Sequence, residues 1–197
     1  MKIIGITGPT GAGKSILRDW FEMNNIPCID ADDVYHKMLI PPSECLDALR
    51  QEFGDGIFAP DGTLDRAKLG AIVFSSPEKL ELLNRTVLDK VLCRIRSLIS
   101  EHKKNGYDSV AVDAPTLIES GFNTECSIVI SILAPKEVRK QRIMERDSLS
   151  LDKAELRVNA QKDDEFYRDH SDVVIVNDKG RDHLEKEISS ALAKILG

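Results

Sequence analysis

The residues with the clearest chemistry lie near the start of the chain, directly after the apolar run at residues 3–6. Glycines in such a stretch let successive backbone N–H groups converge on one point, and a helix N-terminus that follows adds further unpaired N–H groups. That point can hold a phosphate. The stretch consists of Gly8, Pro9, Thr10, Gly11, Ala12, Gly13, Lys14 and Ser15, with Ile16 next.

The loop has the pattern of a glycine, four residues and then Gly-Lys-Ser, which predicts roles for the lysine and the serine. Lys14 would reach the β- and γ-phosphates of a bound nucleoside triphosphate, and the Ser15 hydroxyl would be a ligand of the Mg²⁺ that travels with the nucleotide. The alternative is a glycine-rich turn with no ligand. The strand before the loop and the helix after it favour the nucleotide.

Three aspartates follow the short apolar segment at residues 26–29: Asp30, Asp32 and Asp33. Carboxylates at the carboxyl end of a strand lie where open parallel sheets bind ligands. On an extended backbone Asp30 and Asp32 would project from the same side, and either could accept the proton of a hydroxyl acceptor. Alternatively these acids open the next helix, and Asp33 is the one we expect there. His36, one helical turn after Asp32, is a candidate for the acceptor site.

Arginines form a second candidate group: Arg139, Arg142 and Arg146 are three and four residues apart and therefore share one helix face. Like charges at this spacing disfavour an isolated helix, so we expect an anionic partner. A triphosphate beneath a mobile two-helix lid is one candidate, and Arg157 on the following helix could join it. Surface pairs with nearby glutamates are the alternative.

Asp113 ends the apolar strand predicted at residues 108–113. It has the position of the Walker-B acid, which holds Mg²⁺ directly or through water. A turn residue that ends the strand is the alternative. The sequence therefore predicts Ser15 and Asp113 as metal-site residues.

The elements that position these residues alternate along most of the chain. Strands are predicted at residues 3–6, 26–29, 108–113, 127–133 and 173–176, with a helix after most of them, which indicates an α/β fold with a doubly wound, five-stranded parallel sheet of the P-loop NTPase type. We expect a nucleotide-binding core (1–32, 106–135 and 170–197), a helical acceptor domain (33–105, with a long helix at 77–103) and a two-helix lid (136–169, with helices at 136–146 and 151–162).

Composition limits the partners. A net charge of −6 argues against a general nucleic-acid or membrane-surface binder, so we expect neither partner. The four cysteines form no Cys-x-x-Cys pair, which suggests free thiols in a reducing compartment. No signal peptide or membrane span is evident, so we expect a cytoplasmic protein, as a monomer or a weak homo-oligomer.

Together these motifs resemble the dephospho-CoA kinase family over nearly the whole chain. The specific part is Asp-Ala-Asp at residues 30–32 with Pro-x-Leu-Ile-Glu at 115–119 and the lid pattern. The resemblance extends over residues 7–15, 29–32, 53–54, 61–66, 69–70, 72–74, 83–84, 113–121, 141–143, 146–147, 157–158 and 161. It implies ATP- and Mg²⁺-dependent phosphorylation of the ribose 3′-hydroxyl of dephospho-CoA, the last step of coenzyme A synthesis.

The resemblance also implies roles for single residues. Asp32 becomes the catalytic base and Asp30 a candidate partner of Mg²⁺-bound water. Arg142 would lie against the adenine and phosphates of ATP, with Asn177 near the base. Residues that would help to hold the acceptor are Arg66, Pro115, Leu117 and Glu119.

Alternatives and one departure remain. Another small-metabolite or nucleoside kinase has the same phosphate loop, and so does a nucleotide-dependent switch. The helical insertion with an acid at its mouth favours a kinase. The sequence has no Asn-Lys-x-Asp segment for base recognition, which argues against a GTPase. Many family members have His-Pro where this chain has Leu88 and Asp89, which puts acceptor affinity in question.

Overall fold

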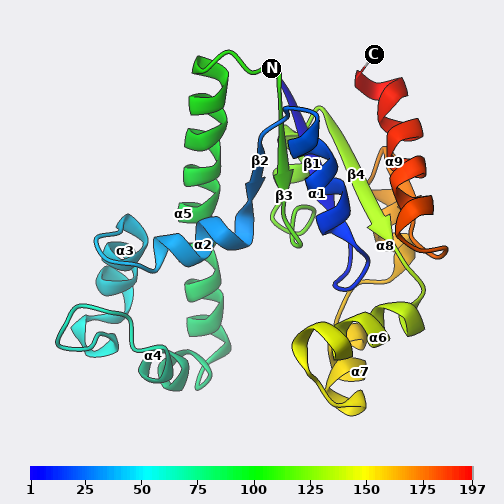
Figure 1. Ribbon diagram of the computed structural model, residues 1–197. Coiled ribbons are helices and arrows are strands. Elements are labelled where there is room, and N and C mark those ends of the chain that lie inside the picture. The colour runs from blue at the N-terminus through cyan, green and yellow to red at the C-terminus, as the bar shows by residue number, and fades with distance from the viewer. Residues whose placement is uncertain (197) are drawn as a thin grey trace. The chain divides into compact units, whose positions relative to one another are not determined.

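The computed structural model describes residues 1–196, which divide into two compact units (Figure 1). The first unit contains Met1–Ile29 and the chain from His102 onward, and the second is Asp30–Glu101. The described residues contain one five-stranded sheet in the order β2-β3-β1-β4-β5. The strands are β1 (Lys2–Thr7), β2 (Cys28–Asp30), β3 (Ser109–Asp113), β4 (Ile128–Leu133) and β5 (Val173–Val176).

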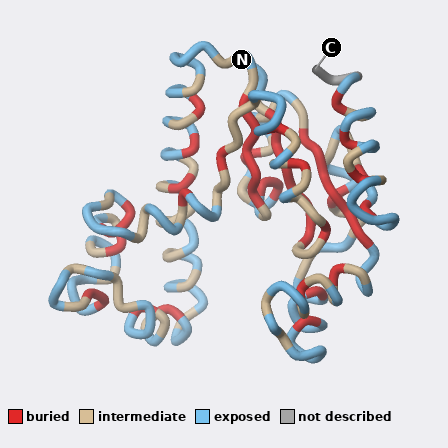
Figure 2. The backbone as a smooth tube through the Cα atoms, in the orientation of Figure 1, coloured by how far each residue is buried: buried red, intermediate tan, exposed pale blue. Residues whose placement is uncertain are grey.

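The paired strands β3, β1, β4 and β5 are all parallel, which confirms the predicted doubly wound α/β fold. Their sequences are nearly continuous apolar runs, as expected for strands with helices on both faces. Ile4, Ile6 and Ile130 are completely buried in this sheet, and Figure 2 shows the strands as the most continuous buried part of the unit. Two helices complete this core, α1 (Lys14–Met23) and α9 (Arg181–Leu196).

Three helices lie between β4 and β5: α6 (Lys136–Asp147), α7 (Leu151–Asn159) and α8 (Asp164–Asp169). The helices α6 and α7 pack through Ile143 and Val158. We expected α7 to continue to residue 162, but it ends at Asn159 and a separate short helix follows. The Asp163 carboxylate starts that helix because it accepts a hydrogen bond from the Phe166 N–H at 2.9 Å.

The second unit is helical, as predicted from the helical spacing of its apolar residues. Its helices are α2 (Ala31–Met38), α3 (Glu44–Phe53), α4 (Arg66–Val73) and most of α5 (Pro77–Lys104). Residues at helical spacing from α3 and α4 form its own buried cluster, which includes Leu49 and Leu69. None of the helices in residues 1–196 is long and apolar enough to cross a membrane.

Candidate active site

The loop between β1 and α1 requires glycine at particular places. Gly8 has a φ of 132°, and a Cβ added there would lie 2.2 Å from the Ile132 carbonyl oxygen. Gly13 has a φ of 106°, and its Cβ would lie 2.5 Å from the Asn177 Nδ2 atom. Both positions therefore exclude a side chain, and the loop can press against the ends of β4 and β5. This close fit gives the loop the cradle shape that phosphate binding needs.

Lys14 is the first residue of α1, and its ammonium folds back over the loop. The Nζ atom donates a hydrogen bond to the Gly8 carbonyl oxygen at 2.8 Å. Ser15 follows in the first turn of α1 and is exposed, and the first backbone N–H groups of a helix have no carbonyl one turn earlier within the helix to bind. The helix start thus offers N–H donors, an ammonium and a hydroxyl within one short segment. Ile16 N–H binds the Gly13 carbonyl oxygen at 3.1 Å and fixes this turn.

Arg142 and Asn177 come from distant elements and meet at the same loop. The Arg142 Nη1 atom donates to the Gly11 and Ala12 carbonyl oxygens at 3.2 and 3.4 Å, and its Nη2 atom donates to Asn177 Oδ1 at 3.2 Å. Asn177 is 3% exposed and donates from Nδ2 to the Ala12 carbonyl oxygen at 2.8 Å. These contacts place both residues beside the candidate nucleotide site.

The structure adds a contact for which sequence reasoning predicted no role. The Thr10 N–H donates to the side-chain Oε1 atom of Gln161 at 2.8 Å. Gln161 follows α7, far from Thr10 in the sequence. It belongs to the family pattern at residues 157–161, but the spacing of a pattern cannot show which residue of another segment it contacts.

Asp113 ends β3 and lies opposite Ile6 of β1 in the parallel register, beside the strand that leads into the loop. It is 7% exposed, and Arg18 Nη1 lies 3.9 Å from its Oδ2 atom. The carboxylate of Asp113 and the hydroxyl of Ser15 are hard oxygen donors of the kind that Mg²⁺ prefers. Residues 1–196 contain no group of three or more His, Cys, Asp or Glu side chains that could hold a metal by themselves. A metal here would therefore need phosphate oxygens as well, as Mg²⁺ in nucleotide sites does.

The three arginines on α6 have three different environments. Arg142 contacts the loop, whereas Arg139 is completely buried, and among the described residues no side chain or backbone group forms a hydrogen bond with its guanidinium. Burial lowers the pKa of Arg139, and the charges of Asp164 and Tyr167 act in the opposite direction. Burial also raises the pKa of Tyr167, to about 12. The Arg139 guanidinium is therefore a buried cation without a hydrogen-bond partner among the described residues.

Arg146 and Arg157 share one carboxylate. Arg146 Nε lies 2.7 Å from Asp147 Oδ1, and Arg157 Nη1 lies 2.6 Å from Asp147 Oδ2. These contacts lower the pKa of Asp147, with the Arg146 hydrogen bond as the largest cause. The shared ion pair joins the end of α6 to α7.

The segment after β3 contains three of the expected acceptor residues. Pro115 accepts a hydrogen bond through its carbonyl oxygen from Thr7 Oγ1 at 3.3 Å. Leu117 is completely buried, and its Cδ2 atom would lie 2.6 Å from a Cβ added to Gly5. Glu119 is exposed. Of these side chains, only those of Pro115 and Glu119 are accessible to a ligand.

Asp30 and Asp32 differ from expectation. Asp30 is the N-cap of α2, and its Oδ1 atom accepts from the N–H groups of Asp32 and Asp33 at 2.9 and 3.1 Å. Asp33 lies in the first turn of α2, where we expected it, but the cap itself is Asp30. The expected extended backbone from Asp30 to Asp32 is wrong. The physical reason is that the Asp30 cap satisfies two N–H groups and starts the helix at Ala31. Asp32 and His36 are exposed, one turn apart on α2.

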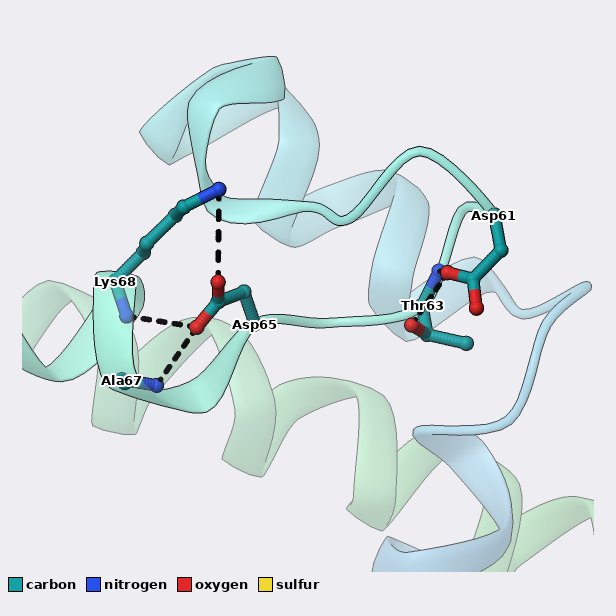
Figure 3. A network of polar contacts seen from close by, with 5 residues as sticks. All are labelled: Asp61, Thr63, Asp65, Ala67 and Lys68. Carbon is teal, nitrogen blue, oxygen red and sulfur yellow. Dashed lines mark hydrogen bonds and ion pairs between the residues drawn. The ribbon is translucent and has the colours of Figure 1, made fainter.

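Arg66 is the first residue of α4, and a local network fixes its position (Figure 3). Asp65 Oδ1 accepts from the N–H groups of Ala67 and Lys68 at 3.1 and 3.0 Å, and Asp65 Oδ2 lies 3.5 Å from Lys68 Nζ. The Lys68 N–H is the largest cause of a lowered pKa of Asp65. The capped turn holds the Arg66 backbone while its side chain stays exposed.

Leu88 and Asp89, which replace the family His-Pro pair, lie within α5. Leu88 is half-buried and Asp89 is exposed. The helix continues through both positions without a break. This departure from the family pattern therefore changes the side chains on α5 and leaves the helix itself intact.

This chain is similar to known proteins over nearly its whole length. The sequence model of the dephospho-CoA kinase family matches residues 2–183. Dephospho-CoA kinase from Enterococcus faecalis is 32% identical over 100% of this chain and 98% of its own, and the enzyme from Arabidopsis thaliana is 34% identical over 99% of this chain and 84% of its own. The solved structure of dephospho-CoA kinase from Campylobacter jejuni is 28% identical, has a TM-score of 0.72, and covers 99% of this chain and 98% of the other.

Proposed function

Because this chain belongs to the dephospho-CoA kinase family, we propose that it transfers the γ-phosphoryl group of ATP to the ribose 3′-hydroxyl of dephospho-CoA, in the last step of coenzyme A synthesis. The observation that carries the proposal is the loop at residues 8–15. Its glycines are required by geometry, and it ends in a lysine at a helix start. That arrangement is built for a nucleotide phosphate.

The donor half of the reaction belongs to the first unit. The N–H groups at the start of α1 hold the phosphates, and Lys14 exchanges its bond with the Gly8 carbonyl oxygen for the β- and γ-phosphates. Arg142 and Asn177 fix the other side of the loop through its carbonyl oxygens. The positive groups Lys14 and Arg142 stabilise the negative charge that spreads over the transferring phosphoryl group.

Mg²⁺ fits the oxygen donors at this site. Ser15 and Asp113 would hold it together with phosphate oxygens. When bound, the metal neutralises charge on the phosphates. The chain itself keeps Asp113 buried beside the strand that leads into the loop, with Arg18 Nη1 3.9 Å from its Oδ2 atom.

The acceptor half belongs to the helical unit. Asp32 acts as the base that orients the 3′-hydroxyl and accepts its proton, which suits a carboxylate that is exposed on the first turn of a capped helix. The Asp30 cap holds the backbone of that turn. His36 and Arg66 contact the acceptor, and Arg66 supplies a cation for its phosphates.

The assignment is tested by a competition among acceptors. Protein, ATP and Mg²⁺ are incubated with a mixture of dephospho-CoA, shikimate, gluconate and nucleosides, and the products are identified by mass spectrometry. We expect a phosphate only on dephospho-CoA, at the 3′-oxygen. Phosphorylation of another alcohol, with dephospho-CoA unchanged, would refute the proposal. The Lys14→Ala protein is the matched control for contaminating kinases.

A further inference from the structure

Gln161 forms a hydrogen bond with the phosphate loop and has no task in the mechanism above. Its side chain is half-buried, and its Oε1 atom accepts the Thr10 N–H at 2.8 Å. Both residues belong to the first unit. A backbone hydrogen bond between segments so far apart fixes a long side chain at the cost of its rotamer entropy. We therefore expect this ordered Gln161 side chain to have a further role in the site.

The chemistry of an amide gives Gln161 a second function. The Thr10 N–H is a donor, so it can bind only the oxygen of the Gln161 side-chain amide. The amino group of that amide is therefore not used in this contact. That group has two N–H donors. The contact therefore uses one N–H of the loop and supplies two others next to it, from the segment between α7 and α8.

The position of Lys14 shows which part of a nucleotide these donors would meet. A P-loop lysine binds the β- and γ-phosphates, whereas the N–H groups of the loop and helix start hold the phosphates closer to the nucleoside. Here the Lys14 ammonium lies at the Gly8 carbonyl oxygen, 2.8 Å away. The terminal phosphate is thus expected toward the Gly8–Thr10 side of the loop. Gln161 is bonded to Thr10 on that side.

From these contacts we infer that Gln161 is a binding residue for the terminal phosphate of ATP. Its oxygen stays on the Thr10 N–H, and its amino group donates to the γ-phosphoryl oxygens. The inference rests on the proposed kinase function, since it needs a nucleoside triphosphate in the loop. It makes a specific claim: Gln161 distinguishes ATP from ADP.

Nucleotide binding without acceptor tests this claim. Titration calorimetry with Mg²⁺-ATP and Mg²⁺-ADP is carried out on the natural protein and on Gln161→Ala, with Gln141→Ala as matched control because Gln141 is exposed on α6 and binds only Glu145 among the described residues. We expect Gln161→Ala to weaken ATP binding roughly tenfold, as for a hydrogen bond to a charged group, and to leave ADP binding within about twofold. Gln141→Ala should change neither.

A charged variant makes the test sharper. Gln161→Glu keeps an oxygen for the Thr10 N–H but replaces the donors by a second oxygen with negative charge, so we expect a larger loss for ATP than in Gln161→Ala. Equal losses for ATP and ADP would overturn the inference and make Gln161 a brace of the loop. Tighter binding in Gln161→Ala would also overturn it, because the glutamine would then obstruct the site. A failure to phosphorylate dephospho-CoA would refute the proposed function and leave these titrations valid.

Discussion

At the scale of single residues, position in the fold decides what a side-chain type does. The α6 arginines share one helix face by spacing, yet Arg142 binds the loop, Arg139 is buried and Arg146 pairs with Asp147. Spacing alone predicts their common face and cannot predict the partners, because the partners come from other segments. The same holds for Asp30. Its position after an apolar segment predicts a catalytic or metal-site carboxylate, but its contacts show that it caps α2.

Replacement of Asp32 by asparagine tests the assignment of the base. Asparagine has the same shape but cannot accept the proton, so we expect kcat for dephospho-CoA to fall by roughly 10²–10⁴. ATP affinity should stay unchanged because the phosphate loop lies in the other unit. The measurement is steady-state kinetics together with ATP titration. Asp33→Asn is the control, since Asp33 is a neighbour that pairs with Lys37 at 2.6 Å. Normal turnover in Asp32→Asn would remove this residue from the mechanism.

Asn177 tests how the loop is supported. Its buried amide bonds both Ala12 and Arg142, so Asn177→Ala leaves buried polar groups without partners and should lower the free energy of unfolding by about 1–3 kcal/mol. We also expect weaker ATP binding, since Arg142 loses one of its anchors. Urea unfolding measures the first effect. Asn84→Ala, an exposed position on α5, should change the free energy of unfolding by less than about 0.5 kcal/mol. Equal effects of both substitutions would contradict the supporting role.

At the scale of elements, apolar periodicity predicts most of the structure. The runs at residues 128–133 and 173–176 are strands because all of their residues except Ser131 are apolar. The short helix α8 was missed because its six residues are polar on most sides, and a cap at Asp163 starts it. Such a helix depends on tertiary contacts, here of Tyr167 with Ile118 and Leu133, which local patterns do not show.

The buried charge of Arg139 on α6 is expected to lower the stability of the ligand-free protein and to support activity. Methionine fills a similar volume without charge, so Arg139→Met should raise the free energy of unfolding of the ligand-free protein by about 1–3 kcal/mol. Turnover should fall, because we propose that this buried guanidinium, which has no hydrogen-bond partner among the described residues, meets a phosphate oxygen of the bound nucleotide. Thermal unfolding and kinetics are measured in parallel. Lys140→Met is the control, since Lys140 is the next residue of α6 and pairs at 2.7 Å with Glu137, whose side chain is 81% exposed. A large loss of stability in Arg139→Met would show that the guanidinium has a partner within the protein.

The Asp147 ion pair predicts a dependence on pH. The pKa of Asp147 is lowered in the folded protein, so the carboxylate stabilises the fold above its ordinary pKa of about 4, and this contribution is lost as the pH falls through the lowered value. We expect Asp147→Asn to be less stable than the natural protein at pH 7 and to approach it near pH 3. Urea unfolding at several pH values measures this difference. A difference that persists unchanged at pH 3 would show that packing, and not charge, is responsible.

At the scale of the whole molecule, the sequence predicts the parts better than their contacts. The change from apolar runs to helical periodicity after residue 33 predicts a helical insertion, and the structure has a separate helical unit from Asp30 to Glu101 with its own core. The contacts of Thr10 with Gln161, and of Ala12 with Asn177, could not be predicted. They depend on how the chain returns to β1 after more than a hundred residues, which no local pattern contains.

Hydrogen exchange can assign each ligand to a unit. A ligand that binds only the folded state raises the free energy of opening by about 2.7 kcal/mol when its concentration is a hundred times Kd, and amides in the unit that binds it slow first. We expect ATP to protect α1 and α6, which contribute Lys14 and Arg142, and dephospho-CoA to protect α2 and α4, which contain Asp32 and Arg66. Lys14→Ala should lose the first effect and keep the second. If dephospho-CoA slowed exchange only in the first unit, the helical unit would not be the acceptor domain, and Asp32 would need another role.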